Sequence, residues 1–311
     1  MLEIINLLPP RPVAEFLKNV FFKHATSNYY YLDERWIEEA LGVLYSCGAN
    51  LCAKDVTAAC LVMMVLAVGT QYAHLESSQR QRRYSSSSAP NPGSDPNSEL
   101  DIGSAFYRQV ARLLSEIIHS GSLLSVQVCL LLGLYTLPID ASGLGYIYLN
   151  LAIKLAIQNG MHRKTSRNAF DTNTEEIRRR VWWSAYCMER YVCTMLVDCM
   201  DFCSHIRVHR RIGAYHGRPA SISRSEIDVG MPAPQVSGQD DSVRNPFDIA
   251  NLLASIELTS QIEASLLGMY GLPVLAVPGS LQSPLTDRVT DWRFADLDDR
   301  RQEQLSVVSK V

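Results

Sequence analysis

The residues with the most metal-like spacing are Cys199, Cys203, His205 and His209. Thiolates and imidazoles are the ligands that zinc prefers in proteins, so the group invites interpretation as a zinc site. In a zinc finger, however, about a dozen residues separate the cysteine pair from the histidine pair and fold into a hairpin and helix. Here only Ser204 separates the two pairs, and on a helix the pairs would point to different faces. We therefore expect no metal site in this chain.

Three consecutive arginines, Arg178, Arg179 and Arg180, are of a type that contacts DNA phosphates. They follow Glu175 and Glu176, and successive residues fan around a helix instead of lining one groove. We favour a solvated helix face in which the arginines pair with these glutamates and cover apolar surface with their stems. The net charge is −3, with 29 basic and 32 acidic residues, which is not the footprint of a DNA-binding surface. The chain alone is expected to bind duplex DNA weakly and without sequence preference.

The aromatic residues Trp182, Trp183 and Tyr186 follow directly. They would suit an aromatic ligand platform, but such residues more often anchor helix packing, which is the interpretation we favour. The sequence contains no nucleophile elbow, Walker loop, dinucleotide-binding turn or His-Glu-x-x-His motif. We therefore name no catalytic residue and expect a protein that is not an enzyme.

The eight cysteines are scattered, and no Cys-x-x-Cys pair occurs. Most stand in apolar helical runs, where free cysteine behaves as a small hydrophobe, so a reducing compartment is expected. The first residues lack the basic region of a signal peptide.

Two apolar runs raise the question of a membrane. The first, 57–68, is shorter than the roughly 20 residues that span a bilayer. The second, 123–139, contains Gln127 and reaches Pro138. We expect both to be buried core helices, and we expect no membrane partner.

The elements that must position these residues are helices, because apolar residues recur at spacings of three and four. The expected helices begin near Pro12, Asp33, Asp55, Asp101 (to Ile118), Ser122 (to Leu137), Gly143 (to Asn159), Thr172 and Ile249 (to Tyr270). A turn is expected over 138–142, a left-handed stop at Gly160, and a capping box at Thr172-x-x-Glu175. The sequence predicts an all-α fold, a multi-helix array with one core.

Two segments interrupt the helical pattern. Residues 76–97 are rich in Ser, Arg, Pro and Asn and are expected to form a disordered loop inside the domain. Residues 197–216 mix Cys, His and Arg without period and read as an irregular insert. We predict one domain over 1–275 and a poorly ordered C-terminal tail over 276–311.

Three short motifs stand in a fixed order along the chain. The first is Gly160-Met161-His162-Arg163. The second is a helix carrying Arg180, Trp182, Trp183, Glu189 and Arg190. The third is Gly217-Arg218-Pro219, followed by Ile222, Asp228 and Pro232. Together they resemble the fungal-specific transcription factor domain, the middle homology region of zinc-cluster regulators such as xylanolytic activators. The resemblance runs from about Leu8 to Leu275 and implies regulation of transcription in a fungal nucleus.

The chain departs from this family in lacking a counterpart of its six-cysteine zinc cluster. DNA binding and zinc, as implied by the resemblance, would therefore belong to a segment outside these residues, and no cofactor is expected here. A small-molecule inducer bound between helices, a second copy and the transcription machinery are the other partners that the resemblance implies. Two alternatives remain open: a helical enzyme with an unrecognised site, and a protein-interaction module without the cluster.

A second departure is the insert itself. In the family, the helix after the tryptophan pair runs almost directly into the Gly-Arg-Pro loop, whereas here 197–216 intervenes. A translated intron and a genuine loop are both open hypotheses. If the segment is foreign to the fold, joining Leu196 to Gly217 should leave the melting temperature equal or higher.

Overall fold

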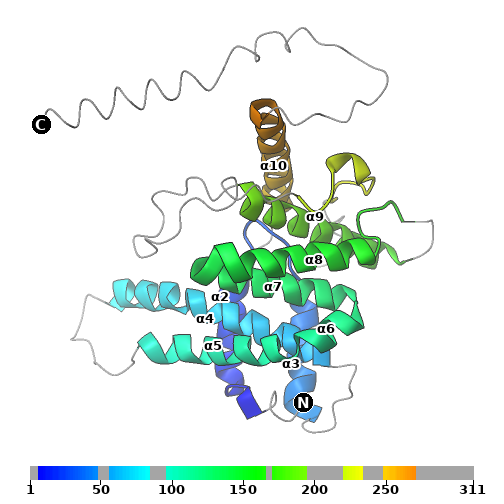
Figure 1. The fold of residues 1–311 in the computed structure, drawn as a ribbon. Helices are drawn as coiled ribbons and strands as arrows, with labels where there is room; N and C mark the ends of the chain where they lie inside the picture. The colour runs from blue at the N-terminus through cyan, green and yellow to red at the C-terminus, as the bar shows by residue number, and fades with distance from the viewer. Residues whose placement is uncertain are drawn as a thin grey trace, which may run out of the picture. The chain divides into compact units, whose positions relative to one another are not determined.

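The structure is a computed structural model that describes residues 6–47, 56–84, 96–165, 170–194, 220–233 and 248–270. Within these ranges every regular element is a helix, which confirms the all-α prediction (Figure 1). The elements are α2 (Arg11–His24), α3 (Glu34–Cys47), α4 (Val56–Tyr84), α5 (Pro96–Arg112), α6 (Leu114–Ser120), α7 (Leu123–Asp140), η3 (Ala141–Gly145), α8 (Tyr146–Gln158), α9 (Thr172–Thr194), η4 (Arg224–Glu226) and α10 (Ile249–Tyr270). Backbone contacts group 1–259 into one compact unit and 260–311 into a second, and the helical core belongs to the first.

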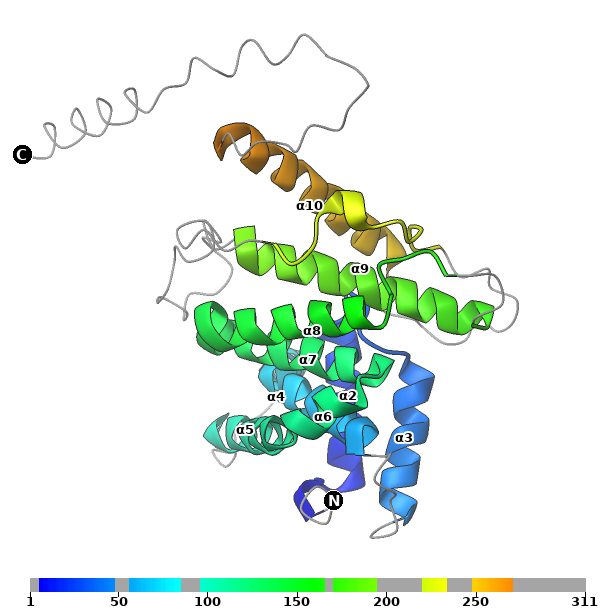
Figure 2. The ribbon, with the colours of Figure 1, turned by 45° about the vertical axis from the view of Figure 1, so that its right-hand side comes forward.

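The core of this first unit is built on α4 and α7. In Figures 1 and 2, α9, α8, α7 and α4 follow one another, and each contacts the next. Helix α4 also packs against α2, α3 and α5. Both α4 and α7 carry long apolar stretches without a polar face, as expected of helices surrounded by others.

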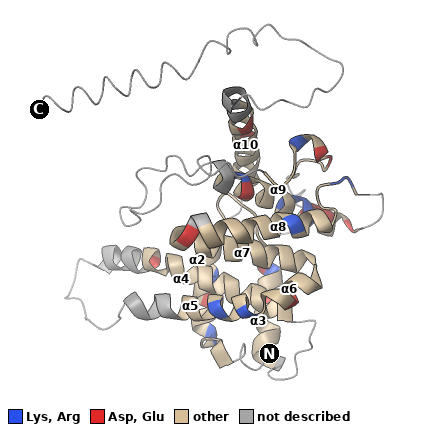
Figure 3. Cartoon of the chain, in the orientation of Figure 1, with Lys and Arg blue, Asp and Glu red and all other residues tan. Residues whose placement is uncertain are grey.

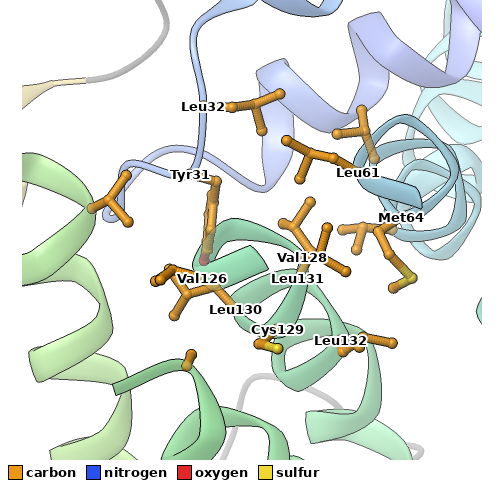
Figure 4. Packing of buried hydrophobic residues seen from close by; sticks show 14 of the residues in the cluster. Tyr31, Leu32, Leu61, Met64, Val126, Val128, Cys129, Leu130, Leu131 and Leu132 are labelled. Atoms are coloured by element: carbon orange, nitrogen blue, oxygen red, sulfur yellow. The ribbon is translucent and has the colours of Figure 1, made fainter. Parts of the chain in front are cut away.

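Side chains from separate elements meet in this core. Figure 4 shows Leu61 and Met64 of α4 beside Val128 and Leu131 of α7, with Tyr31 from the connection between α2 and α3. All five are buried. Leu131 of α7 and Ala156 in the helix after it are also fully buried, both 0% exposed.

Two helices pass the length and composition test for a membrane span, Val56–Glu76 and Leu123–Asp140. Most of each is buried inside the helix packing, which is how core helices behave. The expectation that the first run is too short was wrong, because the helical segment that passes the test is 21 residues long. Burial, and not length, supports the core interpretation.

The predicted starts and stops of helices were confirmed at two positions. The Asp33 carboxylate accepts a hydrogen bond from the Arg35 amide (2.8 Å) and caps α3. Gly160 has φ +66°, and the Met161 amide donates to the Ala156 carbonyl (3.0 Å). This is the hydrogen bond of a left-handed helix stop, and it closes α8.

The predicted capping box at Thr172 was wrong. The Asp171 carboxylate accepts from the Thr174 amide (3.0 Å), so Asp171 caps α9 one residue earlier. Glu175 does not reach back to the cap and instead pairs with Arg179 (3.0 Å).

The predicted disordered loop over 76–97 was wrong at both ends. Helix α4 continues to Tyr84 and α5 begins at Pro96, while 85–95 lie outside the described residues. Glu76 itself has tertiary partners on α2. Its carboxylate accepts from Lys23 and lies 2.8 Å from the His24 ring.

Two further boundaries differ from the prediction. The expected helix 101–118 is broken at Leu113 into α5 and α6. The expected turn over 138–142 is instead the last turn of α7 followed by the π-helix η3. Pro138 is exposed in that last turn and has no N–H to donate to the carbonyl of Leu134. The Asp140 carboxylate then accepts from the Gly143 and Leu144 amides at 2.9 and 3.2 Å.

One face of helix α2 is buried and the other is exposed. Val13 and Phe16 are 40% and 36% exposed, whereas Ala14, Leu17 and Lys18 are buried. Lys18 can be buried because its ammonium group pairs with Glu38 (2.6 Å).

Helix α2 crosses α4 with no room for a side chain at Gly69. A Cβ atom there would lie 2.4 Å from the carbonyl oxygen of Leu17. The close approach of the two backbones therefore depends on glycine at this position.

Candidate functional site

The motif residues meet along an extended segment that we call the strap, residues 220–233. It contains the short turn η4 and runs alongside α9, in yellow in Figure 2. Its side chains Ile222 and Ile227 are buried, and so is Pro232. The strap thus joins motifs that are far apart in the sequence.

The first anchor of the strap is a buried ion pair. Glu189 and Arg190 have side chains that are 0% and 3% exposed, and they contact each other. The Glu189 carboxylate accepts from the Ser221 amide (2.9 Å), and Arg190 donates to the Ile222 carbonyl. Buried charges are tolerated only when paired and hydrogen-bonded, so the strap backbone completes the solvation of this pair.

The Arg190 guanidinium also lies over the ring of Tyr186, 4.6 Å from its centre. This contact explains why an aromatic residue one helical turn before Arg190 is useful here. A cation over an aromatic face is attracted by the ring's negative face.

The second anchor is the turn that follows α8. The carbonyl of His162 accepts from the amides of Asp228 (3.1 Å) and Val229 (3.2 Å). The Asp228 carboxylate accepts from the Lys164 amide (2.7 Å) and lies 3.5 Å from the Arg163 guanidinium. The left-handed stop at the end of α8 is what turns this carbonyl toward the strap.

The third anchor is the N-terminal half of α9. The Trp183 indole N–H donates to the Gly230 carbonyl (2.9 Å). Glu176 accepts from the Ala233 amide, and Arg180 donates to the Ala233 carbonyl, both at 2.9 Å. Glu176 and Arg180 also pair with each other at 2.9 Å. Both backbone groups of Ala233, the amide and the carbonyl, are therefore bound by side chains of α9.

The tryptophan pair serves packing, as expected. Trp182 and Trp183 are both 0% exposed. Trp182 stacks obliquely on His162, with ring centres 5.8 Å apart, and its indole N–H has no partner among the described residues. Burial lowers the pKa of His162, and the Arg163 charge lowers it further, so the ring is neutral at pH 7.

The three arginines are committed to intramolecular contacts. Arg178 donates to the Asn159 carbonyl (2.7 Å), and Arg179 pairs with both Glu175 and Glu176. The predicted pairing with the glutamates is confirmed for Arg179 and Arg180. The predicted solvated face was wrong, because Arg180 is only 6% exposed. In the view of Figure 3, Lys and Arg are interspersed with Asp and Glu.

The most strongly shifted pKa values belong to packed core residues. Burial raises the pKa of Cys60 and of Cys129 to about 12, so neither thiol is a ready nucleophile. Burial likewise raises the pKa of Tyr29, Tyr30 and Tyr31. These shifts follow from helix packing and do not mark a polar cleft of the kind that an enzyme would need.

A cleft of about 350 Å³ opens between α2 and α3. The charged residues that line it are paired, Arg11 with Glu15 and Lys18 with Glu38. Nothing in their charges selects one class of ligand. Among the residues that the structure describes, no three or more His, Cys, Asp and Glu side chains are placed to hold a metal ion.

Several predicted positions lie outside the described ranges. They are Gly217, Arg218, Pro219, the insert 197–216 with its Cys and His residues, and the domain boundary at 275. Conversely, sequence reasoning missed Glu176 and Ser221 as contacts between α9 and the strap. The signal for Glu176 was its position four residues before Arg180, which places both on one helix face.

Comparison with known proteins identifies the family. Residues 19–198 match the family model described as the fungal specific transcription factor domain. An uncharacterized transcriptional regulatory protein of Schizosaccharomyces pombe is 28% identical over 254 residues, which is 80% of this chain. The thiamine repressible genes regulatory protein thi1 of the same yeast is 26% identical over 62% of this chain, and the activator of stress genes 1 of Saccharomyces cerevisiae is 25% identical over 74%.

The matched regions span only 28%, 23% and 21% of these three relatives. No solved structure shows significant similarity. The family match covers more than half of the chain, and the relatives are named as transcription regulators. This chain therefore belongs to the fungal-specific transcription factor domain family and is a regulatory domain of a transcription factor.

Proposed function

We propose that the chain acts in the nucleus as the signal-receiving and partner-binding part of a transcription regulator, and that it performs no chemistry of its own. The observation that carries this proposal is what the side chains of the family motifs do in the structure. Their charged and aromatic side chains are used to hold the strap on α8 and α9. Residues used in this way stabilise a folded scaffold whose surface partner proteins can bind.

DNA recognition is assigned in this proposal to a zinc-cluster segment outside these residues. Two observations support that assignment. The arginines of α9 are engaged by Glu175, Glu176 and backbone carbonyls, so they are not available to phosphates. The formal net charge of −3 also gives no general attraction to DNA.

A reporter assay tests the regulatory role. The chain is placed between a heterologous DNA-binding domain and an activation domain, and expression of a reporter gene is compared with that of the same fusion lacking the chain. We expect the chain to change the output several-fold. The variant Glu189→Gln, which loosens the strap, should change it again, whereas Glu15→Gln on the exposed surface of α2 should not.

Equal reporter output with and without the chain, at equal protein level, would contradict the regulatory role.

A separate titration tests whether the chain itself recognises DNA. The purified chain should bind duplex DNA at physiological salt without sequence selectivity. Selective binding would overturn the assignment of DNA recognition to another segment.

A further inference from the structure

Ser221 stands at the point where the strap meets its buried anchor. Its amide donates to the Glu189 carboxylate (2.9 Å), and its hydroxyl donates to the Asn150 side-chain oxygen on α8 (3.0 Å). The Lys154 ammonium group lies 3.4 Å from the Ser221 carbonyl. The serine is half-buried, so its hydroxyl is part of the contact between strap and helix.

The sequence around Ser221 is basic. Arg218 stands three residues before it and Arg224 three residues after it, with no acidic residue between them. Protein kinases choose serines largely by such charge patterns, and those with acidic substrate grooves favour arginine on the N-terminal side. The strap backbone is extended at Ser223 (φ −76°, ψ 147°), directly before the η4 turn.

We propose that Ser221 is a phosphorylation site for an arginine-directed serine/threonine protein kinase, and that docking of the strap controls access to it. In the reaction the Ser221 hydroxyl oxygen bonds to the γ-phosphorus of ATP. The bond from that phosphorus to the oxygen bridging to the β-phosphate breaks, and ADP leaves. The hydroxyl proton passes to the catalytic carboxylate of the kinase.

Access depends on the strap because the docked hydroxyl faces Asn150. The kinase therefore modifies chains in which the first residues of the strap are undocked from α8. Because the modified chains no longer redock, the equilibrium shifts toward the undocked state. The new phosphate carries a charge of about −1.5 to −2 at pH 7. Redocking would bring it beside Glu189, whose side chain is 0% exposed and already satisfied by Arg190.

Lys154 does not offset this repulsion, because it is exposed and its attraction is screened by water. Phosphorylation thus keeps the N-terminal end of the strap undocked. The proposal rests on the strap contacts of Ser221 and on the basic sequence from Arg218 to Arg224. It stands or fails independently of the reporter result.

The test uses the purified chain, the catalytic subunit of cyclic-AMP-dependent protein kinase and magnesium ATP. Mass spectrometry should place phosphate on Ser221, and Ser221→Ala should remove that phosphate while Ser223→Ala keeps it. The rate should rise several-fold in Asn150→Ala, which deletes the partner of the hydroxyl and leaves the buried ion pair intact. A peptide of residues 214–228 should be modified fastest, because it has no docked state.

Amide exchange measures the consequence. In the phosphorylated chain the Ser221 amide should exchange at least tenfold faster, while the core amides of α7 keep their protection. The site is overturned if Ser221 stays unmodified in the chain, in Asn150→Ala and in the peptide. A rate in Asn150→Ala no higher than in the parent chain, or an unchanged Ser221 exchange after modification, overturns the control by docking.

Discussion

Replacing Glu189 by glutamine isolates the charge that holds the strap, since the two side chains have nearly the same shape. The carboxylate is fully buried, contacts Arg190 and accepts from the Ser221 amide at 2.9 Å. Glutamine can still accept from that amide through its carbonyl oxygen. It cannot neutralise Arg190, whose side chain is 3% exposed.

Breaking a buried ion pair by removing one partner typically costs about 3–5 kcal/mol. Arg190 keeps its hydrogen bond to the Ile222 carbonyl and its place over the Tyr186 ring, so we expect a loss near the lower limit, about 3 kcal/mol. In a domain of this size 1 kcal/mol corresponds to about 2–4 °C, so the melting temperature should fall by about 6–12 °C.

The matched control is Glu15→Gln. Glu15 pairs with Arg11 at 2.9 Å, but the two side chains are 55% and 63% exposed. Exposed pairs one helical turn apart contribute only about 0.3–0.5 kcal/mol. The control should therefore shift the melting temperature by no more than about 2 °C.

The assay is thermal unfolding followed by circular dichroism, completed with Arg190→Met and the double variant Glu189→Gln/Arg190→Met. A coupling energy above about 1 kcal/mol between the two positions is expected for groups in direct contact. If Glu189→Gln costs no more than Glu15→Gln, the buried pair does not hold the strap and the reasoning is refuted.

Three further predictions concern the core and the turn after α8. In unfolding experiments, Gly69→Ala should destabilise the domain by about 1–3 kcal/mol relative to the control Gly42→Ala. The Cβ atom at position 69 would lie 2.4 Å from the Leu17 carbonyl oxygen, whereas nothing lies within 4 Å of a Cβ atom at position 42. Both changes gain the same helix propensity, so equal stabilities would refute the close helix crossing. The pKa of His162 is lowered in the folded state. The stability that this neutral ring contributes should therefore be fully present above about pH 6.5 and decline as the pH falls toward the folded pKa. His162→Asn should flatten that part of a curve of unfolding free energy against pH. Leu131→Asp places an unpaired charge at a fully buried position and should abolish cooperative melting, and a soluble, cooperatively melting variant would contradict the core assignment.

Much of the helical core could be predicted from the sequence because local signals and tertiary packing agree there. The apolar runs became the central helices α4 and α7, and Gly160 became the stop of α8. The errors arose where a distant residue changed the local outcome. Composition placed Glu76 in a disordered loop, but Lys23 and His24 on α2 bind its carboxylate.

The strap was the part of the site least accessible to sequence reasoning. It has no helical or strand period, and its partners are backbone groups, which every residue carries. The resemblance to a family indicated that Trp183 and Asp228 belong to one site. It did not indicate that the indole binds the Gly230 carbonyl or that the His162 carbonyl binds the Asp228 amide.

Amide hydrogen exchange of the strap, resolved to single residues in the unmodified chain, tests the central claim most directly. The amides of Asp228, Val229 and Ala233 donate to α9 and to the turn after α8, so they should exchange slowly. Among the described residues, the amides of Gly230 and Met231 in the same segment have no such acceptor, and they should exchange fast. A docked strap therefore predicts fast exchange at two amides that lie between slowly exchanging ones. Uniformly fast exchange across the strap would show that the motif residues do not hold it, and would contradict the account.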